Sequence, residues 1–175
     1  MHPASVDDLL ERYDAECEQA ADPYWAVPWP SAFAMAEYLH EHGSAVANKR
    51  VCDAGCGLGL AGIAALACGA SFVALADREP LAVRCAELGA SASGFAVASD
   101  ARADATCTAV FGSEGDPPPR APPDAPQVAM GAVFDWDEAE DYDAMLERAG
   151  GRFDVLLLCD VLYEARQARP VANMA

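Results

Sequence analysis

A glycine-rich turn between an apolar segment and a helical pattern constrains the fold of this chain more than any other feature. Residues 51–62 read Val-Cys-Asp-Ala-Gly-Cys-Gly-Leu-Gly-Leu-Ala-Gly. An apolar run ends in Asp53, and alternating glycines follow at Gly55, Gly57 and Gly59. A turn that opens directly into a helix lets the backbone approach a nucleotide-like ligand where a Cβ could not be accommodated. We therefore expect a strand, a ligand-binding turn and a helix, in that order.

A second apolar run, Ser71–Ala76, also ends in an acid, Asp77. An acid at the tip of the second strand of such a unit is placed to accept hydrogen bonds from a ribose. Strands are predicted at 50–54, 71–76, 128–134 and 153–159, and the helices between them at 58–68, 80–90 and 138–149. This alternation predicts an α/β fold in which helices cover both faces of a parallel sheet.

The segments outside this alternation differ in composition. Helical spacing predicts helices over 5–21 and 31–42, and three prolines exclude a regular helix from residues 22–30, which lie between them. Residues 91–127 are rich in Ala, Ser, Gly, Asp and Pro, which predicts a disordered insertion. We expect a single domain over residues 1–175 that carries this insertion.

The net charge and the hydropathy of the chain limit its partners. A formal net charge of −17 argues against a nucleic-acid groove, because binding a polyphosphate requires clustered Lys and Arg. The charge suits a cationic ligand or a basic protein partner, although solubility alone explains it equally well. The sequence shows no apolar stretch long enough to cross a membrane and no secretory signal, so we expect no membrane contact.

The seven cysteines form no Cys-x-x-Cys pair, and no metal site is predicted. Cys52 and Cys56 flank the start of the glycine turn, which leaves a redox or metal role open there. Reduced thiols are typical of intracellular proteins, so we expect a cytoplasmic protein. The sequence does not indicate the oligomeric state.

The charge around the turn discriminates between nucleotide-like ligands. Gly57-x-Gly59-x-x-Gly62, with Asp77 about twenty residues further on, satisfies the dinucleotide fingerprint and keeps a NAD(P)-dependent oxidoreductase as an alternative. However, Asp53 would lie near the pyrophosphate of a dinucleotide, and the turn contains no basic residue. Negative charge at this place favours a cationic ligand such as an ammonium or a sulfonium.

The same residues resemble a known family. The run 51–59 is similar to the first motif of the class I (seven-β-strand) S-adenosylmethionine-dependent methyltransferases. The segment 23–30, the pair Asp135-Trp136 and the run 160–163, Asp-Val-Leu-Tyr, resemble the branch that contains protein-lysine methyltransferases and nicotinamide-methyltransferase-like proteins. The resemblance covers roughly residues 22–165 without the insertion.

The resemblance implies S-adenosylmethionine as the cofactor. In that family the glycine turn lies against the methionine part of the cofactor, a role that falls here on Gly55, Gly57 and Gly59. It places Asp53 near the amino group and Asp77 at the ribose hydroxyls, where a carboxylate accepts charge-assisted hydrogen bonds.

The resemblance also implies roles for residues near the later strands. Asp135 and Trp136 would border the adenine, and Trp29 would close over cofactor and substrate. Asp160 and Tyr163 would be the catalytic residues that orient a protein substrate, most readily a lysine side chain, whose cation an aromatic ring also binds. The expected function is therefore methylation of a protein lysine.

The length of the chain leaves alternatives open. The family's sheet has seven strands, whereas this sequence ends shortly after the fourth predicted strand, so we expect only the N-terminal four strands and an exposed edge at residues 155–158. A catalytically inactive module that binds the cofactor or another protein therefore remains an alternative to the enzyme.

Overall fold

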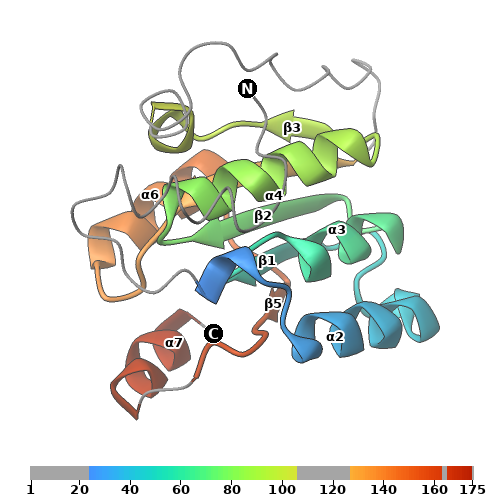
Figure 1. Cartoon of the computed structure of the whole chain (residues 1–175), viewed down its shortest axis with the longest axis horizontal. Helices are drawn as coiled ribbons and strands as arrows, with labels where there is room; N and C mark the ends of the chain where they lie inside the picture. The colour runs from blue at the N-terminus through green and yellow to red at the C-terminus, as the bar shows by residue number, and fades with distance from the viewer. Residues whose placement is uncertain (1–23, 106–126, 163–164, 175) are drawn as a thin grey trace.

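A five-stranded parallel sheet forms the centre of the computed structural model, which describes residues 24–105, 127–162 and 165–174 (Figure 1). The strands are β1 (Arg50–Ala54), β2 (Phe72–Asp77), β3 (Ala96–Ala98), β4 (Val128–Val133) and β5 (Val155–Leu157). Their order is β3-β4-β2-β1-β5, and every neighbouring pair is parallel. The chain first builds β2, β3 and β4 on one side of β1 and then crosses over to add β5 on its other side, so the strand order reverses at β1. Open α/β sheets bind ligands at such a point, beyond the carboxyl ends of the strands.

Helices cover both faces of the sheet, which confirms the predicted α/β, Rossmann-like fold. Helices α2 (Pro30–Glu41), α3 (Leu60–Ala67) and α4 (Pro80–Ala92) pack on one face, whereas α6 (Ala139–Ala149) and the end of α7 (Ala168–Met174) pack on the other. Neighbouring residues of β1 enter different cores: Val51 packs with Leu66 of α3, and Cys52 packs with Met145 of α6. This alternation is expected for a strand buried on both faces.

One strand was not predicted from the sequence. β3 pairs with β4 at an edge of the sheet, α4 continues to Ala92, and residues 101–105 are helical. Residues 91–105 therefore belong to the fold and not to the disordered insertion that their composition predicts. A strand of three small residues has too short a hydrophobic period to be recognised. The remainder of that insertion, 106–126, lies outside the described residues, as does most of the helix predicted over 5–21.

At the other edge of the sheet, β5 is shorter than predicted. It spans Val155–Leu157 instead of 153–159, and it pairs with β1. The expectation that residues 155–158 form an edge agrees with the strand order of the described sheet. The chain leaves β5 at residue 158 and runs along the carboxyl ends of the strands.

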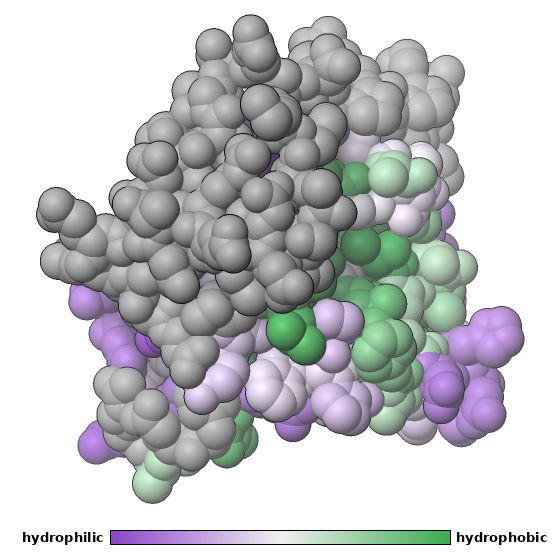
Figure 2. All heavy atoms as spheres, in the orientation of Figure 1, coloured by the Kyte–Doolittle hydropathy of each residue, from purple (hydrophilic) through white to green (hydrophobic). Residues whose placement is uncertain are grey.

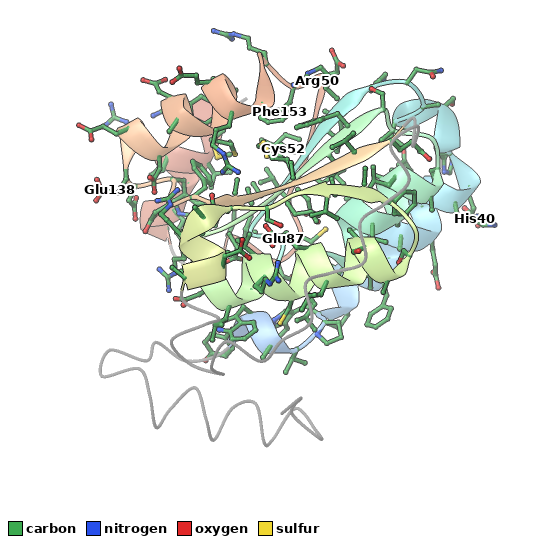
Figure 3. All side chains as sticks on the ribbon, turned by 90° about the horizontal axis from the view of Figure 1, so that it is seen from above. His40, Arg50, Cys52, Glu87, Glu138 and Phe153 are labelled. Atoms are coloured by element: carbon green, nitrogen blue, oxygen red, sulfur yellow. The ribbon has the colours of Figure 1, made fainter. Side chains whose placement is uncertain are left out.

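A buried ionic network fastens β3 and β4 to α4. Glu87 of α4 is completely buried; its Oε1 accepts the N–H of Asp100 at 2.8 Å and its Oε2 lies 3.0 Å from Nη1 of Arg84. Asp100 in turn accepts the N–H of Val133 at 3.1 Å and a hydrogen bond from Arg148 at 2.5 Å. Figure 3 shows Glu87 pointing from α4 toward the sheet. A buried carboxylate needs such partners, because an unpaired one would be strongly destabilising.

Within the described residues, no helix combines the length and the apolar character that a membrane span requires. The space-filling view in Figure 2 shows apolar residues over the middle of one face of the molecule and hydrophilic residues at its lower right. Large apolar side chains that remain exposed include Tyr24, Val27, Trp29 and Phe33. These residues lie in or near the segment that borders the cleft described next.

Candidate functional site

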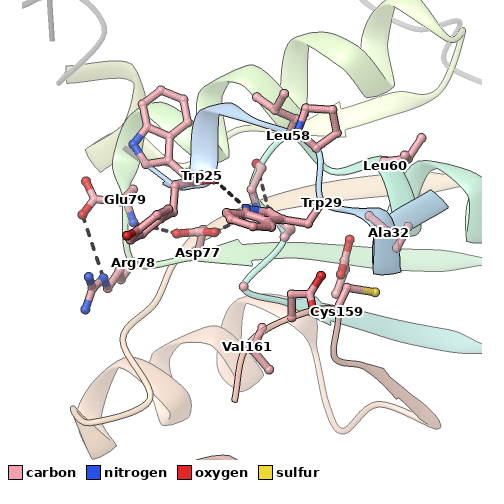
Figure 4. A pocket seen from close by; sticks show the side chains of 18 of the residues that line it. Trp25, Trp29, Ala32, Leu58, Leu60, Asp77, Arg78, Glu79, Cys159 and Val161 are labelled. Atoms are coloured by element: carbon pink, nitrogen blue, oxygen red, sulfur yellow. Dashed lines mark hydrogen bonds and ion pairs between the residues drawn. The ribbon is translucent and has the colours of Figure 1, made fainter. Parts of the chain in front are cut away.

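A cleft opens at the carboxyl ends of β1, β2, β4 and β5. Residues 24–29, here called the strap, begin with the 3₁₀ turn η1 (Tyr24–Ala26) and cross its open side, with Trp25 and Trp29 drawn above Asp77 in Figure 4. The cleft brings together most of the residues that the sequence analysis singled out: Trp29, Asp53, Gly55, Gly57, Asp77, Asp135, Trp136 and Asp160. Tyr163 lies outside the described residues, and Gly59 faces another part of the fold.

Asp77 joins the tip of β2 to the glycine turn. Its Oδ2 accepts the N–H of Gly57 at 2.9 Å, and its Oδ1 accepts the N–H of Glu79 at 3.0 Å. Desolvation raises the pKa of the Asp77 carboxyl above its usual value, and these two hydrogen bonds oppose the rise. Each carboxylate oxygen can accept more than one hydrogen bond, so Asp77 retains capacity for a ligand hydroxyl.

Asp53 lies deeper in the cleft. Its side chain is buried, and its Oδ2 accepts the N–H of Gly62 in the first turn of α3 at 2.8 Å. Burial raises the pKa of Asp53 to about 7, the Gly62 hydrogen bond opposes this rise, and the nearby Asp77 adds to it. In the structure Asp53 therefore satisfies a helix N-terminus, a partner that the sequence analysis did not predict.

The glycines of the turn have different neighbours. At Gly57 φ is +52°, and a Cβ there would lie 3.1 Å from the carbonyl oxygen of Trp25 in the strap. At Gly59 φ is +79°, and a Cβ would lie 2.8 Å from Cβ of Ala86 in α4. Gly57 thus borders the cleft, whereas Gly59 allows α3 and α4 to approach each other. A fingerprint in the sequence cannot separate these two reasons for a glycine.

The strap is held by its own aromatic residues. Nε1 of Trp29 donates a hydrogen bond to the carbonyl oxygen of Tyr24 at 2.9 Å, and the centroids of the two rings are 5.8 Å apart. Both side chains are nevertheless about half exposed, at 54% for Tyr24 and 43% for Trp29. An exposed aromatic pair at the mouth of a cleft can contact a ligand or a partner as well as stabilise the strap.

On the β4 side, Asp135 and Trp136 follow the strand after one intervening residue, Phe134. The N–H of Asp135 donates to Oδ2 of Asp141 in α6 at 3.2 Å, and Asp141 also binds Nη1 of Arg102 at 3.0 Å. The ring of Trp136 lies 3.5 Å from the position that a Cβ on Gly55 would occupy. Trp136 therefore forms an apolar wall beside the glycine turn.

On the β5 side, Asp160 is exposed and has φ of +53°, a left-handed conformation that is uncommon outside glycine. Its Oδ2 lies 2.5 Å from the hydroxyl of Ser31, which donates the hydrogen bond from the first turn of α2. Sequence reasoning missed this contact, because nothing in the local pattern relates residues so far apart in the chain.

The charges of the cleft are predominantly negative. The acids that line it are Asp53, Asp77, Glu79, Asp135 and Asp160, and Arg78 is the one cationic side chain in that lining within the described part of the chain. Arg78 lies 3.9 Å from Glu79. Because a low-dielectric cleft strengthens electrostatic interactions, this arrangement favours a cationic ligand over the pyrophosphate of a dinucleotide.

Two thiols also line the cleft, Cys56 and Cys159. Burial, with a contribution from neighbouring acids, raises the pKa of Cys56 well above its usual value and that of Cys159 to about 11. Both thiols therefore stay protonated near neutral pH and are poor nucleophiles. Cys52, the other cysteine near the turn, is a buried free thiol, and no group of potential metal ligands occurs among the described residues.

Comparisons with known proteins identify relatives of part of this chain. It is 46% identical over 61 residues to the electron transfer flavoprotein beta subunit lysine methyltransferase of Danio rerio, a match that covers 35% of this chain and 24% of the relative. The same enzyme of Homo sapiens is 42% identical over 62 residues, 35% of this chain and 24% of the relative. A histone-arginine methyltransferase, METTL23 of Xenopus laevis, is 42% identical over 50 residues, 29% of this chain and 21% of the relative.

This chain is a partial homologue of the class I S-adenosylmethionine-dependent methyltransferases. The parallel sheet agrees with the family resemblance. No family model matches the sequence, and the matches span only about a quarter of the length of these curated relatives.

Proposed function

We propose that this methyltransferase homologue binds S-adenosylmethionine in the cleft and transfers its methyl group to a protein side chain, most readily that of lysine. The observation that carries the proposal is the position of Asp53 and Asp77, which bind the backbone of Gly62 and of Gly57 and line the same cleft. The relatives support it, because each is by its description a methyltransferase that acts on a protein.

The residues present suit this cofactor. The absence of a Cβ at Gly57 lets the turn approach the strap closely, and Asp77, which accepts the Gly57 N–H, would also accept hydrogen bonds from the ribose hydroxyls. Asp53 would balance the positive charge of the amino-acid part, and Asp135 and Trp136 would border the adenine. When bound, S-adenosylmethionine supplies a methyl group activated by the adjacent sulfonium.

The protein would contribute mainly by alignment, because methyl transfer is an in-line displacement. Asp160 lies at the mouth of the cleft, is exposed, and would bind the ammonium group of the acceptor, which has to release a proton to solvent before the neutral amine attacks the methyl group. We retain Tyr163 as an aromatic partner for the same ammonium group. The strap, with Trp29, would exclude water from the reacting atoms.

Calorimetric titration with S-adenosylmethionine and with S-adenosylhomocysteine tests the cofactor proposal. We expect micromolar affinity, which Gly57→Arg should abolish, because the new side chain would enter the cleft beneath the strap. Gly94→Arg is the matched control: Gly94 has φ of +88°, but a Cβ there meets nothing within 4 Å. A folded wild-type protein that binds neither compound would overturn the proposal.

Transfer of a radiolabelled methyl group tests the acceptor. The beta subunit of electron transfer flavoprotein and histones are the first substrates to try, since relatives are named for them. Labelled lysine in the hydrolysed product supports lysine methylation, whereas labelled arginine corrects the acceptor. Cofactor binding without transfer to these proteins or to a cell extract would favour the non-catalytic module.

A further inference from the structure

The hydrogen bond between Ser31 and Asp160 joins the start of α2 to the cleft-lining turn after β5, two segments that are 129 residues apart in the sequence. Ser31 lies in the first turn of α2, directly after the strap, and Asp160 lies in the turn that follows β5. The distance of 2.5 Å between Oγ and Oδ2 is in the range of hydrogen bonds from a hydroxyl to a carboxylate. Within the described part of the chain, Ser31 is the one side chain that binds the Asp160 carboxylate.

Side chains on both sides of Asp160 hold this turn. The φ of +53° at Asp160 is a left-handed conformation, which Asp adopts more readily than most residues with a side chain. The side chain of Val161, the next residue, is buried against the glycine turn: a Cβ on Gly55 would lie 2.5 Å from its Cγ1. Val161 therefore anchors one side of the turn, and Ser31 anchors the carboxylate.

The position of the Asp160 carboxylate near the N-terminus of α2 gives a second reason for its contact with Ser31. The N-cap residue of α2, Trp29, provides no side-chain hydrogen bond to the helix. The N-terminus of a helix carries a partial positive charge, which favours a carboxylate close to its first turn. The N-terminus of α2 therefore attracts the Asp160 carboxylate, and the Ser31 hydroxyl binds one of its two oxygens, Oδ2.

We propose that Ser31 is a positioning residue, which orients the Asp160 carboxylate for the amino group of the acceptor and couples this carboxylate to the strap through the start of α2. Ser31 does not line the cleft, whereas Ala32, Trp29 and Asp160 do. It acts through Asp160, because its hydroxyl holds Oδ2 and leaves Oδ1 for the acceptor. The role in catalysis rests on the proposed function, but the coupling of the two segments does not.

The first test measures the coupling without any substrate. Hydrogen exchange of residues 159–162 is compared in the wild type, Ser31→Ala, Ser31→Thr and Ser93→Ala. Ser93 is the matched control, since it is an exposed serine at a helix end whose hydroxyl donates to the carbonyl oxygen of Gly89 at 2.8 Å. We expect exchange in Ser31→Ala to be about tenfold faster, since a local hydrogen bond that limits opening is lost. Ser31→Thr, which keeps the hydroxyl, and Ser93→Ala should match the wild type.

The second test measures the catalytic role on the acceptor that the wild type methylates. Ser31→Ala should lower kcat by about tenfold, because misalignment of a reacting group slows the transfer. Its affinity for S-adenosylhomocysteine should stay within about twofold of the wild type, because Ser31 does not line the cleft. In the background of Asp160→Asn, removing the Ser31 hydroxyl should have little further effect on kcat, because the two residues act as a unit.

The outcomes separate the two proposals. Unchanged exchange in Ser31→Ala overturns the inference, whatever the wild type catalyses. Faster exchange with an unchanged kcat also overturns the positioning role and reduces the contact to a structural one. Failure of the wild type to bind either cofactor form overturns the proposed function, and the exchange experiment then decides the coupling alone.

Discussion

The carboxylate of Asp77 accepts the backbone N–H of Gly57 at 2.9 Å, so the tip of β2 and the glycine turn after β1 form one rigid unit. The turn is fixed to β2 a second time, because the N–H groups of Gly55 and Cys56 both donate to the carbonyl oxygen of Ala76, at 2.8 and 3.0 Å. The acid that would bind the ribose therefore also shapes the surface on which the rest of the cofactor would lie. Its substitution should affect affinity through both roles.

Asp77→Asn tests this double role. The amide oxygen of asparagine can still accept one of the two backbone N–H groups. The amide NH₂ group then faces the other one, that of Gly57 or of Glu79, and two donors cannot form a hydrogen bond. We expect the affinity for S-adenosylhomocysteine to fall about 30-fold, in line with the roughly 2 kcal/mol lost when a charged hydrogen-bond acceptor is removed. Calorimetry measures the affinity, and a thermal melt measures the smaller loss of stability.

Asp154→Asn is the matched control for this prediction. Asp154 likewise accepts a backbone N–H, that of Arg50, at 2.9 Å, but it lies at the opposite end of β1 from the turn. Its substitution should leave the affinity unchanged. Equal losses in the two variants would show that Asp77 acts only through the stability of the fold.

The pKa of Asp53 predicts a pH dependence of cofactor binding. Burial raises this pKa to about 7, so much of the free protein carries a neutral Asp53 at pH 6. A cationic ligand stabilises the ionised form of Asp53, so binding below pH 7 releases the proton of this carboxyl group. Affinity for S-adenosylmethionine should therefore rise as the pH increases from 5.5 to 7, by up to about tenfold per pH unit, and level off above. Calorimetry at several pH values measures this slope.

Asp53→Asn should flatten the slope, because it removes the titrating group. The other groups near Asp53 are Asp77 and the thiols of Cys52, Cys56 and Cys159. Raised pKa values keep these thiols neutral over the range. A slope that persists in Asp53→Asn would assign the effect to Asp77, whose pKa is also raised.

The packing of Glu87 predicts a strong effect of a small substitution in β4. A Cβ on Gly131 would lie 1.9 Å from Oε1 of the buried Glu87. Glu87 cannot move away without losing Asp100 and Arg84, so Gly131→Ala should lower the free energy of unfolding by about 2–3 kcal/mol, as other overpacked cores do. Denaturant unfolding followed by circular dichroism measures the loss.

Gly43→Ala is the control, because a Cβ there would meet atoms only at 3.7 Å or beyond. It should change stability by less than about 0.5 kcal/mol. The loss in the double variant Glu87→Ala with Gly131→Ala should be smaller than the sum of the single losses, because the collision disappears. An additive result would contradict the proposed cause.

The centre of the fold, strands β1 and β2 with the glycine turn, could be predicted well from the sequence. In these segments the local hydrophobic pattern and the packing of the whole sheet favour the same structure. The run 51–62 shows a strand, a turn and a helix in one stretch, and strands that run parallel bring their final acids to the same edge. The convergence of Asp53 and Asp77 follows from that rule.

The contacts that were missed depend on the packing of distant elements. Ser31 meets Asp160 only because α2 packs beside the turn after β5, and Gly131 needs to be glycine only because Glu87 crosses under β4. Strand β3 contains only three residues, too few for the hydrophobic pattern to distinguish a strand from an irregular segment. A single sequence carries no local sign of such relationships, because they arise only when distant segments pack together.

The hydrogen bond that Asp135 donates to Asp141 predicts that a residue outside the cleft affects cofactor binding. Asp141 does not line the cleft, but it holds the N–H of Asp135 at 3.2 Å and Nη1 of Arg102 at 3.0 Å. Asp141→Ala frees the segment that would border the adenine, so the affinity for S-adenosylhomocysteine should fall about fivefold, equivalent to roughly 1 kcal/mol for one lost hydrogen bond. Asp143→Ala, an exposed position on the same helix, should leave the affinity unchanged. Calorimetry measures both variants, and equal affinities would show that Asp135 keeps its place without Asp141.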